Sequence, residues 1–259
     1  MVSQDKEKGE RIAKALSRLG VASRRTVETM IAEGRVSVNG EVITHPATFV
    51  NDADKICVDG APIGAKESAR LWLYHKPKGV MVSERDPEGR TTIYDILPPA
   101  FAGAGALPMP RVMPIGRLDF ATEGLLLLTN SGALKRHLEL PSTGWLRRYR
   151  VRVMGEWQAE FQDQLAAGIT VEGIKFGPIH ASLEPRQRTG GRHCWLDVSL
   201  REGKNREVRR AMQAMGLHVN RLIRISYGPF PLSDLPEGAV REISPKVLRE
   251  QIGNLLETL

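Results

Sequence analysis

Three segments of the sequence carry polar residues in a spacing that could support chemistry. In the first, residues 116–130, a polar loop with Asp119 and Glu123 leads directly into the apolar run at 125–128. A loop at the edge of a buried sheet can aim a partly desolvated carboxylate. Asp119 and Glu123 are therefore candidate catalytic carboxylates, and the alternative is that they are ordinary loop acids.

The second segment, residues 146–153, is a predicted strand rich in arginine. Because side chains alternate between the two faces of a strand, Tyr149 shares a face with the apolar residues Val151 and Val153. The arginines at 148, 150 and 152 take the opposite face. Two interpretations of Tyr149 stay open: a ring that stacks on a base in a pocket, or a tyrosine of the hydrophobic core.

The third segment, residues 200–210, combines a turn with the start of a predicted helix. Asn205 is the expected N-cap, and Lys204 in the preceding turn can pair with a carboxylate from another loop. Helical spacing predicts a buried stripe of Val208, Ala211, Met212 and Met215 and an outward face of Arg206, Arg209, Arg210 and Gln213. Arginines on such a face suit phosphate groups, and the alternative is a solvated basic surface.

Other common catalytic signatures do not occur in the sequence. There is no Gly-rich phosphate loop, dinucleotide fingerprint, paired-histidine metal motif or nucleophile elbow. The six histidines are scattered, and the two cysteines, Cys57 and Cys194, are isolated. We therefore expect no metal, no cofactor and no disulfide framework, in a reducing, cytoplasmic setting.

The charge pattern favours an acidic partner. The chain has 259 residues, 37 Lys plus Arg against 30 Asp plus Glu, and a net charge of +7. Basic residues gather at 11–35, 147–152 and 201–210, and arginine, which binds phosphate in bidentate fashion, predominates in them. These clusters predict a nucleic-acid partner. The polar first ten residues and the short apolar run at 125–128 argue against a signal peptide and a membrane span, so we expect a soluble protein.

The first 66 residues read as a small module. Apolar positions predict a helix with Ile12, Leu16 and Leu19 that Gly20 ends, and a second helix capped by Ser23 and ended by Gly34. A hairpin around Asn39-Gly40 and a strand at 55–58 follow. The small, polar stretch 60–68 predicts a linker, which gives a flexible tail at 1–8, one domain at 9–66 and a second at 67–259.

The second domain is predicted to have strands at 71–75, 125–129, 149–154, 195–200 and 222–226, with short helices between some of them. Strands and helices do not alternate strictly, which indicates an α+β domain with a mixed, largely antiparallel sheet. The Pro-, Ala- and Gly-rich residues 97–114 are predicted to be a loop.

Taken together, the ordered motifs resemble those of the bacterial ribosomal RNA pseudouridine synthases of the RsuA type. Residues 73–79 look like the first motif of the second domain and residues 116–130 like the catalytic-aspartate motif. Residues 148–151 are similar to the tyrosine motif, with Arg148 where members often carry Lys, and residues 202–210 and 221–225 look like the last two. The first module resembles the S-four RNA-binding domain.

This resemblance implies the isomerisation of uridine to pseudouridine without a cofactor, and it assigns roles. Asp119 becomes the nucleophile or a promoter of elimination to a glycal, Lys204 pairs with it and keeps it ionised, and Tyr149 stacks on the uracil and takes part in proton transfer. Arg117 fills the stack that the flipped base vacates, and Leu222 is a pocket wall. The implied RNA-binding residues are Arg11, Lys14, Arg24, Arg25, Arg206, Arg209 and Arg210.

Several alternatives stay open at this point. Within the family, the first module and residues 116–124 look most like members that act on 23S rRNA, and 16S rRNA is the alternative target. A different hypothesis is a ribosome-assembly factor that binds RNA without catalysis. The expected partner is rRNA, free or in an assembly intermediate, and we expect a monomer with no membrane association.

Overall fold

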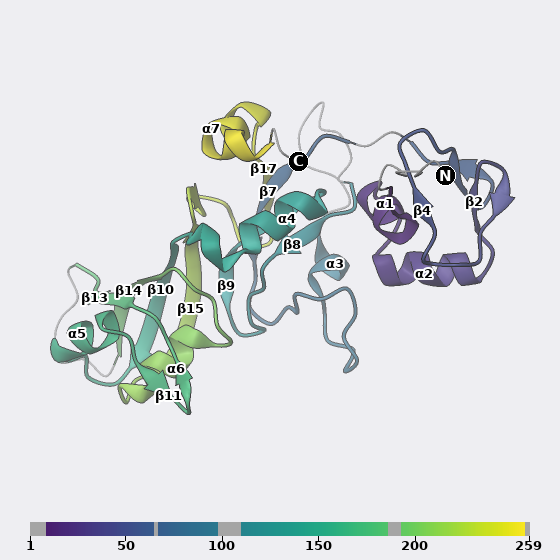
Figure 1. Cartoon of the computed structure of the whole chain (residues 1–259). Coiled ribbons are helices and arrows are strands. Elements are labelled where there is room, and N and C mark those ends of the chain that lie inside the picture. The colour runs from purple at the N-terminus through teal and green to yellow at the C-terminus, as the bar shows by residue number, and fades with distance from the viewer. Residues whose placement is uncertain (1–8, 65–66, 98–109, 186–192, 257–259) are drawn as a thin grey trace, which may run out of the picture. The chain divides into compact units, whose positions relative to one another are not determined.

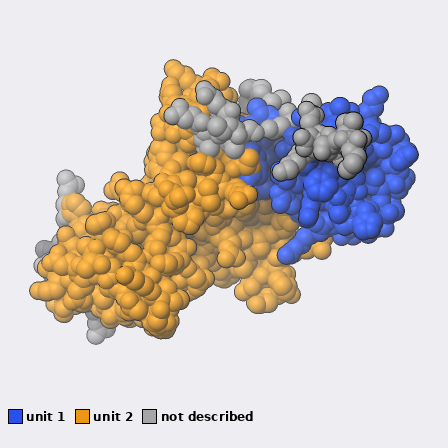
Figure 2. Space-filling model, viewed as in Figure 1, with its two compact units in different colours: residues 1–69, 109–113, 130–132 blue, residues 70–108, 114–129, 133–259 orange. Residues whose placement is uncertain are grey.

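The computed structural model describes residues 9–64, 67–97, 110–185 and 193–256, and the chain forms two compact units (Figure 1). Unit 1 comprises residues 1–69, 109–113 and 130–132, and unit 2 comprises residues 70–108, 114–129 and 133–259 (blue and orange in Figure 2). The predicted tail at 1–8 and the predicted boundary at Lys66 lie outside the described residues. Each unit is described by itself below.

The described residues of unit 1 form two helices and several short strands. The helices are α1 (Ile12–Arg18) and α2 (Arg24–Ala32). Strands β1 (Glu10–Arg11) and β4 (Phe49–Val50) pair with each other. A four-stranded sheet in the order β3-β2-β5-β6 is built from β2 (Val36–Val38), β3 (Glu41–Val42), β5 (Ile56–Val58) and β6 (Ala61–Pro62). The helix–helix–hairpin order matches the prediction.

Local sequence signals in unit 1 act as predicted. The Ser23 hydroxyl accepts a hydrogen bond from the Thr26 N–H at 3.2 Å and so caps α2. Asn39 and Gly40 between β2 and β3 have φ values of 53° and 91°, the left-handed conformation that a tight hairpin turn requires. The inner faces of both helices bury Ile12, Leu16 and Ile31 in one hydrophobic core, together with Val27 and further residues of the strands.

Unit 2 is built around a mixed sheet. Among the described residues its main strand order is β13-β14-β10-β15-β9-β7-β17, with β8 beside β9 and β16 beside β15. The bounds are β7 (Leu71–Lys76), β8 (Met113–Ile115), β9 (Glu123–Thr129), β10 (Arg147–Met154), β13 (Ile179–Leu183), β14 (His193–Leu200), β15 (His218–Tyr227), β16 (Phe230–Pro231) and β17 (Val240–Glu242). Within the described part of the main sheet β15 and β9 run parallel, whereas β13–β14, β14–β10, β10–β15, β15–β16, β9–β7 and β7–β17 are antiparallel pairs. The predicted α+β domain with a mixed, largely antiparallel sheet is thus confirmed.

Helices and short strands surround this sheet. They are α3 (Ile93–Ile96), α4 (Gly132–Glu139), the 3-10 helix η1 (Pro141–Thr143), α5 (Glu160–Ala166), α6 (Glu207–Ala214), α7 (Pro245–Leu256) and the hairpin of β11 (Thr170–Val171) and β12 (Ile174–Lys175). Helices α5 and α6 pack through Leu165, Ala211 and Met212 into the core formed by β10, β13, β14 and β15 (Figure 1). In β10, Tyr149, Val151 and Val153 are buried and the arginines between them are exposed, as strand alternation predicts.

Unit 2 differs from the sequence prediction in several strands, which include the two-residue β11, β12 and β16, and in one loop. Strands β13 and β17 were not predicted, because β13 alternates apolar and polar residues over only five positions and β17 spans only three. The predicted loop at 97–114 ends in a strand, since Met113 and Pro114 belong to β8; its residues 98–109 lie outside the described part.

The parallel contact between β9 and β15 depends on a glycine. Gly124 pairs with Arg224 and has a φ of 102°. A Cβ at this position would lie 2.4 Å from the carbonyl oxygen of Arg224, closer than any side chain can approach. Gly124 therefore lets the start of β9 lie directly against β15, and this places the preceding loop beside β15.

Candidate active site

The loop between β8 and β9 holds its backbone through hydrogen bonds from several elements. Its first residue, Gly116, donates its N–H to Glu139 of α4 at 2.6 Å. The carbonyl oxygens of residues 119 to 122 all accept hydrogen bonds, at 2.8 to 3.0 Å; the donors, in order, are Thr122 N–H, Gly79 N–H, Arg209 Nη2 and Lys76 Nζ. The main chain that carries Asp119 is thus fixed, while the Asp119 side chain is 33% exposed.

The structure separates the two candidate carboxylates. Glu123 is buried at the start of β9 and forms an ion pair with Arg221 of β15, with 2.8 Å between Glu123 Oε2 and Arg221 Nη2. Asp119 instead borders a cavity of about 510 Å³, a size within the range of ligand pockets, roughly 300–1,000 Å³. Of the two, only Asp119 is available to a ligand in this cavity.

All five residues predicted to be catalytic or to bind the substrate line this one cavity. Asp119 and Arg117 come from the β8–β9 loop, Tyr149 from β10, Lys204 from the turn before α6, and Leu222 from β15. Arg117 is exposed, whereas Tyr149 and Leu222 are 9% and 4% exposed. The fold therefore brings together residues more than 100 positions apart in the sequence.

The ion pair predicted between Lys204 and Asp119 is not the one that the structure contains. Lys204 Nζ lies 2.7 Å from Glu202 Oε2 and donates a hydrogen bond to the Lys175 carbonyl oxygen, also at 2.7 Å. The cation beside Asp119 is Arg206, whose Nη1 lies 3.8 Å from Asp119 Oδ2. Glu202, two residues earlier in the same turn, forms the ion pair with Lys204 in place of Asp119. Sequence spacing alone does not show which of the two acids Lys204 will pair with.

Of the outward face predicted for α6, Arg206 and Gln213 are exposed, whereas Arg209 and Arg210 are only partly exposed. The Arg206 side chain is 50% exposed, but Arg209 donates to the carbonyl oxygens of Val219 and Ala121 at 3.1 and 2.8 Å. Arg210 is 19% exposed and lies 2.6 Å from Glu172. The outward position predicted for Arg209 and Arg210 is therefore wrong, because β15, the β8–β9 loop and the β11–β12 hairpin contact that side of the helix.

The start of α6 also differs from the prediction. The N-cap position is Arg206, in a left-handed conformation and with no side-chain capping bond, so Asn205 is not the cap. Glu207 instead accepts the Lys204 N–H at 2.8 Å and satisfies a donor of the turn. Of the predicted buried stripe, Val208, Ala211 and Met212 are buried and Met215 is partly buried.

Arg224 of β15 is a cavity residue to which sequence reasoning gave no separate role. It is 2% exposed, and its Nε donates to the Leu125 carbonyl oxygen at 2.7 Å. Its Nη2 is buried without a hydrogen-bond partner among the described residues. An arginine inside the apolar stretch 222–225 is the signal that could have identified it, because a buried cation needs a specific reason.

A second buried cation, Lys76 at the end of β7, lies beneath the Asp119 loop. It is fully buried and donates to the Pro77 and Thr122 carbonyl oxygens, each at 2.9 Å. Burial lowers the pKa of Lys76 to about 8, and the charges of Asp119 and Glu123 oppose this shift. Lys76 thus places a positive charge near Asp119 without lining the cavity.

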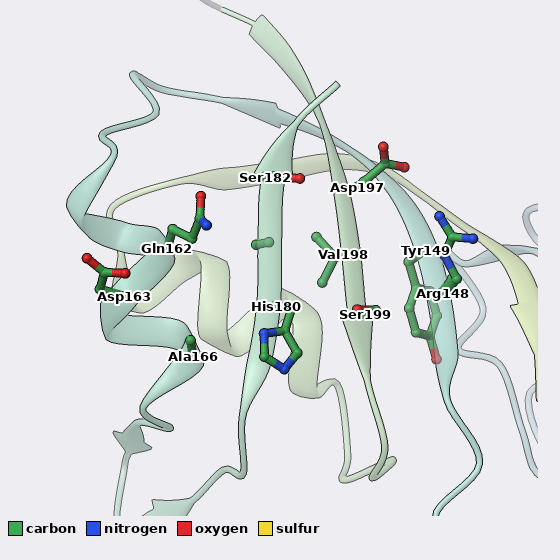
Figure 3. Close-up of a pocket in the computed structure, with 11 residues that line it drawn as sticks. Arg148, Tyr149, Gln162, Asp163, Ala166, His180, Ser182, Asp197, Val198 and Ser199 are labelled. Atoms are coloured by element: carbon green, nitrogen blue, oxygen red, sulfur yellow. The ribbon is translucent and has the colours of Figure 1, made fainter. Parts of the chain in front are cut away.

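Tyr149 also borders a second cavity, of about 340 Å³, between β10, β14, β13 and α5 (Figure 3). Its lining includes Arg148, His180, Asp197 and Asp163. In Figure 3 these polar side chains come from separate strands and from α5, and within the described part of the chain no two of the four form an ion pair. The arrangement gives this cavity no clear chemistry.

The predicted RNA-binding residues of unit 1 lie on its surface. Arg11, Arg24 and Arg25 are exposed. Lys14 is also exposed and lies 3.2 Å from Glu10, one turn away. A surface of this kind is open to phosphate groups, and the role of these residues in RNA binding stays a prediction.

No helix in the described ranges is both long and apolar enough to cross a bilayer.

Comparison with known proteins identifies the class. Residues 70–214 match the family described as RNA pseudouridylate synthase, and residues 10–63 match the S4 domain, the S-four module named above. The chain therefore belongs to the RNA pseudouridine synthase family, the isomerases that the sequence motifs predicted, and its N-terminal part is an S4 domain.

Individual relatives extend the match over nearly the whole chain. An uncharacterized RNA pseudouridine synthase of Rickettsia felis is 41% identical over 241 residues, which cover 93% of this chain and 100% of the relative. Ribosomal large subunit pseudouridine synthase B of Haemophilus influenzae is 40% identical over 268 residues, covering 99% of this chain and 71% of the relative. The crystal structure of a pseudouridylate synthase has the same fold, with a TM-score of 0.61 at 23% identity, covering 93% and 98% of the two chains.

Proposed function

We propose that this protein converts a uridine of ribosomal RNA, in the 23S molecule, to pseudouridine, and that Asp119 carries the reaction. The observation that supports this most directly is the position of Asp119, partly exposed on a fixed loop at the cavity that Tyr149 and Leu222 also line. The cavity and its cations suit a flipped nucleotide with its phosphate. A cytoplasmic location and a monomeric state stay predictions.

The reaction needs a group that acts at the ribose carbon of the glycosidic bond. The bond from this carbon to a uracil nitrogen breaks, the base turns, and a bond to a ring carbon forms while that carbon loses its proton and the nitrogen gains one. The Asp119 carboxylate acts at the ribose, by addition or by promoting elimination. The Tyr149 ring stacks on the base, and its hydroxyl takes part in the proton transfer.

The pairing role that the sequence assigned to Lys204 passes in this proposal to Arg206 and Arg224. Arg206 has a nitrogen 3.8 Å from the Asp119 carboxylate. Arg224 lines the same cavity with a buried nitrogen that has no hydrogen-bond partner among the described residues. A cation near the carboxylate favours its ionised form, which both versions of the reaction need. Lys204 then acts indirectly: its ion pair with Glu202 stabilises the turn that carries Arg206.

Two further residues prepare the substrate. Arg117 is exposed on the Asp119 loop, where its long side chain can enter the stack that the flipped uridine leaves. Leu222 offers an apolar wall for the face of the base. The exposed cations of unit 1 contact RNA phosphates beyond the modified nucleotide.

The deciding experiment is to map pseudouridine in deproteinised and partly assembled rRNA after incubation with the protein. Asp119→Asn keeps the shape of the side chain and loses the carboxylate, so we expect the rate to fall by at least about 100-fold. The control is Asp163→Asn at the second cavity, which should react like the unchanged protein. Full activity of Asp119→Asn would overturn the mechanism, whereas RNA binding without any new pseudouridine would favour the assembly-factor hypothesis.

The preference for 23S rRNA is supported by the large subunit synthase that is 40% identical to this chain. Pseudouridine maps of both rRNA molecules from cells with and without the gene will test it. We expect one pseudouridine to disappear from 23S rRNA, and its return on expression of the wild-type chain. A loss from 16S rRNA alone would contradict the preference while leaving the reaction intact.

A further inference from the structure

Glu207, in the first turn of α6, is a cavity residue that the proposed reaction does not use. It is 4% exposed, and its Oε2 accepts the Lys204 N–H at 2.8 Å. Its Oε1 is buried and has no donor among the described residues. An ionised carboxylate in this position would leave an oxygen without compensation, which is costly.

The Glu207 side chain interacts with a second carboxyl group, Glu202, which like Glu207 holds Lys204. Glu202 accepts the Gly177 N–H and forms the ion pair with Lys204 at 2.7 Å. A carboxylate has only acceptor atoms, so two carboxyl groups can form a hydrogen bond only when one of them carries a proton. The buried Oε1 without a donor is explained if this proton lies between the two groups.

We propose that Glu207 and Glu202 share one proton at neutral pH and that this shared proton positions the active site. The pair joins three segments, the start of α6, the turn at 201–206 and Gly177 after β12. The turn at 201–206 carries Arg206, the cation beside Asp119. This inference rests on the function proposed above, since it assigns Glu207 a positioning role for that reaction.

The surroundings put the proton on Glu207. Burial, with the neighbouring Glu202, raises the pKa of Glu207 to about 8 and outweighs the opposing charge of Lys204. Burial also acts to raise the pKa of Glu202, but its hydrogen bonds with Glu207, Gly177 and Lys204 lower it overall. The other charged groups that line the cavity are Arg117, Asp119, Lys135, Glu139, Arg147, Arg206 and Arg224.

The proposal predicts a loss of activity at alkaline pH. Above about pH 8 the second carboxylate forms, the two groups repel each other, and the turn that carries Arg206 loses its attachment. Glu207→Gln keeps both hydrogen bonds without a titrating proton, because the amide oxygen can accept the Lys204 N–H and the amide nitrogen can donate to Glu202.

The first test compares pH profiles of pseudouridine formation under saturating RNA. The wild-type rate should fall about tenfold per pH unit above pH 8, as for one essential proton, and Glu207→Gln should remain active and lack this component. Lys76 titrates in the same range, but it does so in both proteins, so the difference between the profiles isolates Glu207. The matched control is Glu160→Gln, an exposed first-turn acid of α5, which should follow the wild type. Identical wild-type and Glu207→Gln profiles would overturn the proposal.

The second test needs no activity. In RNA-free protein with carboxyl-¹³C glutamate, one NMR resonance should titrate near pH 8, disappear in Glu207→Gln and move to a lower midpoint in Glu202→Gln. A midpoint near the ordinary glutamate value of about 4.3 would overturn the shared proton. A titration near pH 8 in a protein that forms no pseudouridine would instead refute the proposed function and leave the shared proton standing, so the two failures are distinguishable.

Discussion

At the scale of single residues, the cations around Asp119 differ in what they can do. Arg206 has a nitrogen 3.8 Å from the carboxylate and is half exposed, whereas Lys204 is bound to Glu202 and to a backbone carbonyl. A guanidinium also stays charged at every physiological pH and presents several donors in a plane. The geometry thus favours the arginine as the direct partner of Asp119.

This difference predicts unequal effects of two alanine variants. Arg206→Ala should lower kcat by more than tenfold, because Asp119 loses its charged neighbour, and Arg206→Lys should recover part of the rate. Lys204→Ala should lower kcat by less, because it only loosens the turn that carries Arg206. Single-turnover rates on the same rRNA will measure both. A larger loss in Lys204→Ala than in Arg206→Ala would mean that the sequence-based pairing operates in the RNA complex.

The buried Lys76 predicts a pH dependence of stability. Its pKa is about 8 in the folded protein, whereas an ordinary lysine, as in the unfolded chain, has a pKa of 10.5. Between these two pH values the unfolded chain therefore binds more protons than the folded one. Stability conferred through this group therefore rises as pH increases from about 8 to 10.5. Lys76→Met, which has no such proton, should lack this rise when its stability is measured by denaturant titration between pH 8 and 10.5.

The control for this comparison is Lys246→Met, an exposed lysine in α7. It should show the same pH dependence as the wild type. If Lys76→Met and the wild type changed stability in parallel between pH 8 and 10.5, then Lys76 would keep an ordinary pKa in the fold.

At the scale of elements, the site depends on the contact between β9 and β15. The loop with Asp119 precedes β9, while Leu222 and Arg224 belong to β15, so the parallel contact sets the distance between them. A parallel pair that joins two otherwise antiparallel halves of a sheet depends on a few residues, here Ile223 and Arg224 opposite Glu123 and Gly124.

We therefore expect that even the smallest side chain at position 124 destabilises the fold strongly. Gly124→Ala should cost at least about 3 kcal/mol in free energy of unfolding, because its Cβ would clash with the Arg224 backbone in addition to the backbone strain. Gly238→Ala is the matched control: it has a similar left-handed φ, 78°, with nothing within 4 Å of the added Cβ, and should cost about 1–2 kcal/mol. Equal costs in urea unfolding would show that the close approach does not matter.

At the scale of the whole molecule, the proposed function combines the candidate site of unit 2 with RNA contacts made by the S4 domain. The cavity is lined by residues of unit 2, and the exposed cations of unit 1 are not among them. A division of this kind lets phosphate contacts add affinity while the chemistry stays in the catalytic unit.

Charge reversal in unit 1 should consequently change binding rather than catalysis. Arg25→Glu should weaken rRNA binding and reduce the slope of log affinity against log salt by about 1, with kcat at saturating RNA retained. Lys55→Glu makes the same charge change at another exposed position of unit 1 and should leave the slope unchanged. Equal effects of the two variants would indicate that only the net charge of the unit matters.

The sequence by itself determined the parts of the protein that follow from local periodicity and motifs. Strand alternation placed Tyr149 on the buried face of β10, Ser23 identified a helix start, and the ordered motifs identified the family and Asp119 as its candidate carboxylate. The first two of these inferences use residues close together in the chain, where backbone geometry fixes the direction of a side chain.

Only the tertiary structure decided which charged groups meet. Arg206 rather than Lys204 lies beside Asp119, Lys76 contacts the loop that carries Asp119, and Glu207 and Glu202 both hold Lys204. Such contacts depend on the reach of long side chains between elements that the sequence separates, and on the burial that those elements impose. Spacing along the chain carries neither quantity, because hydrogen bonding and desolvation are properties of the assembled fold.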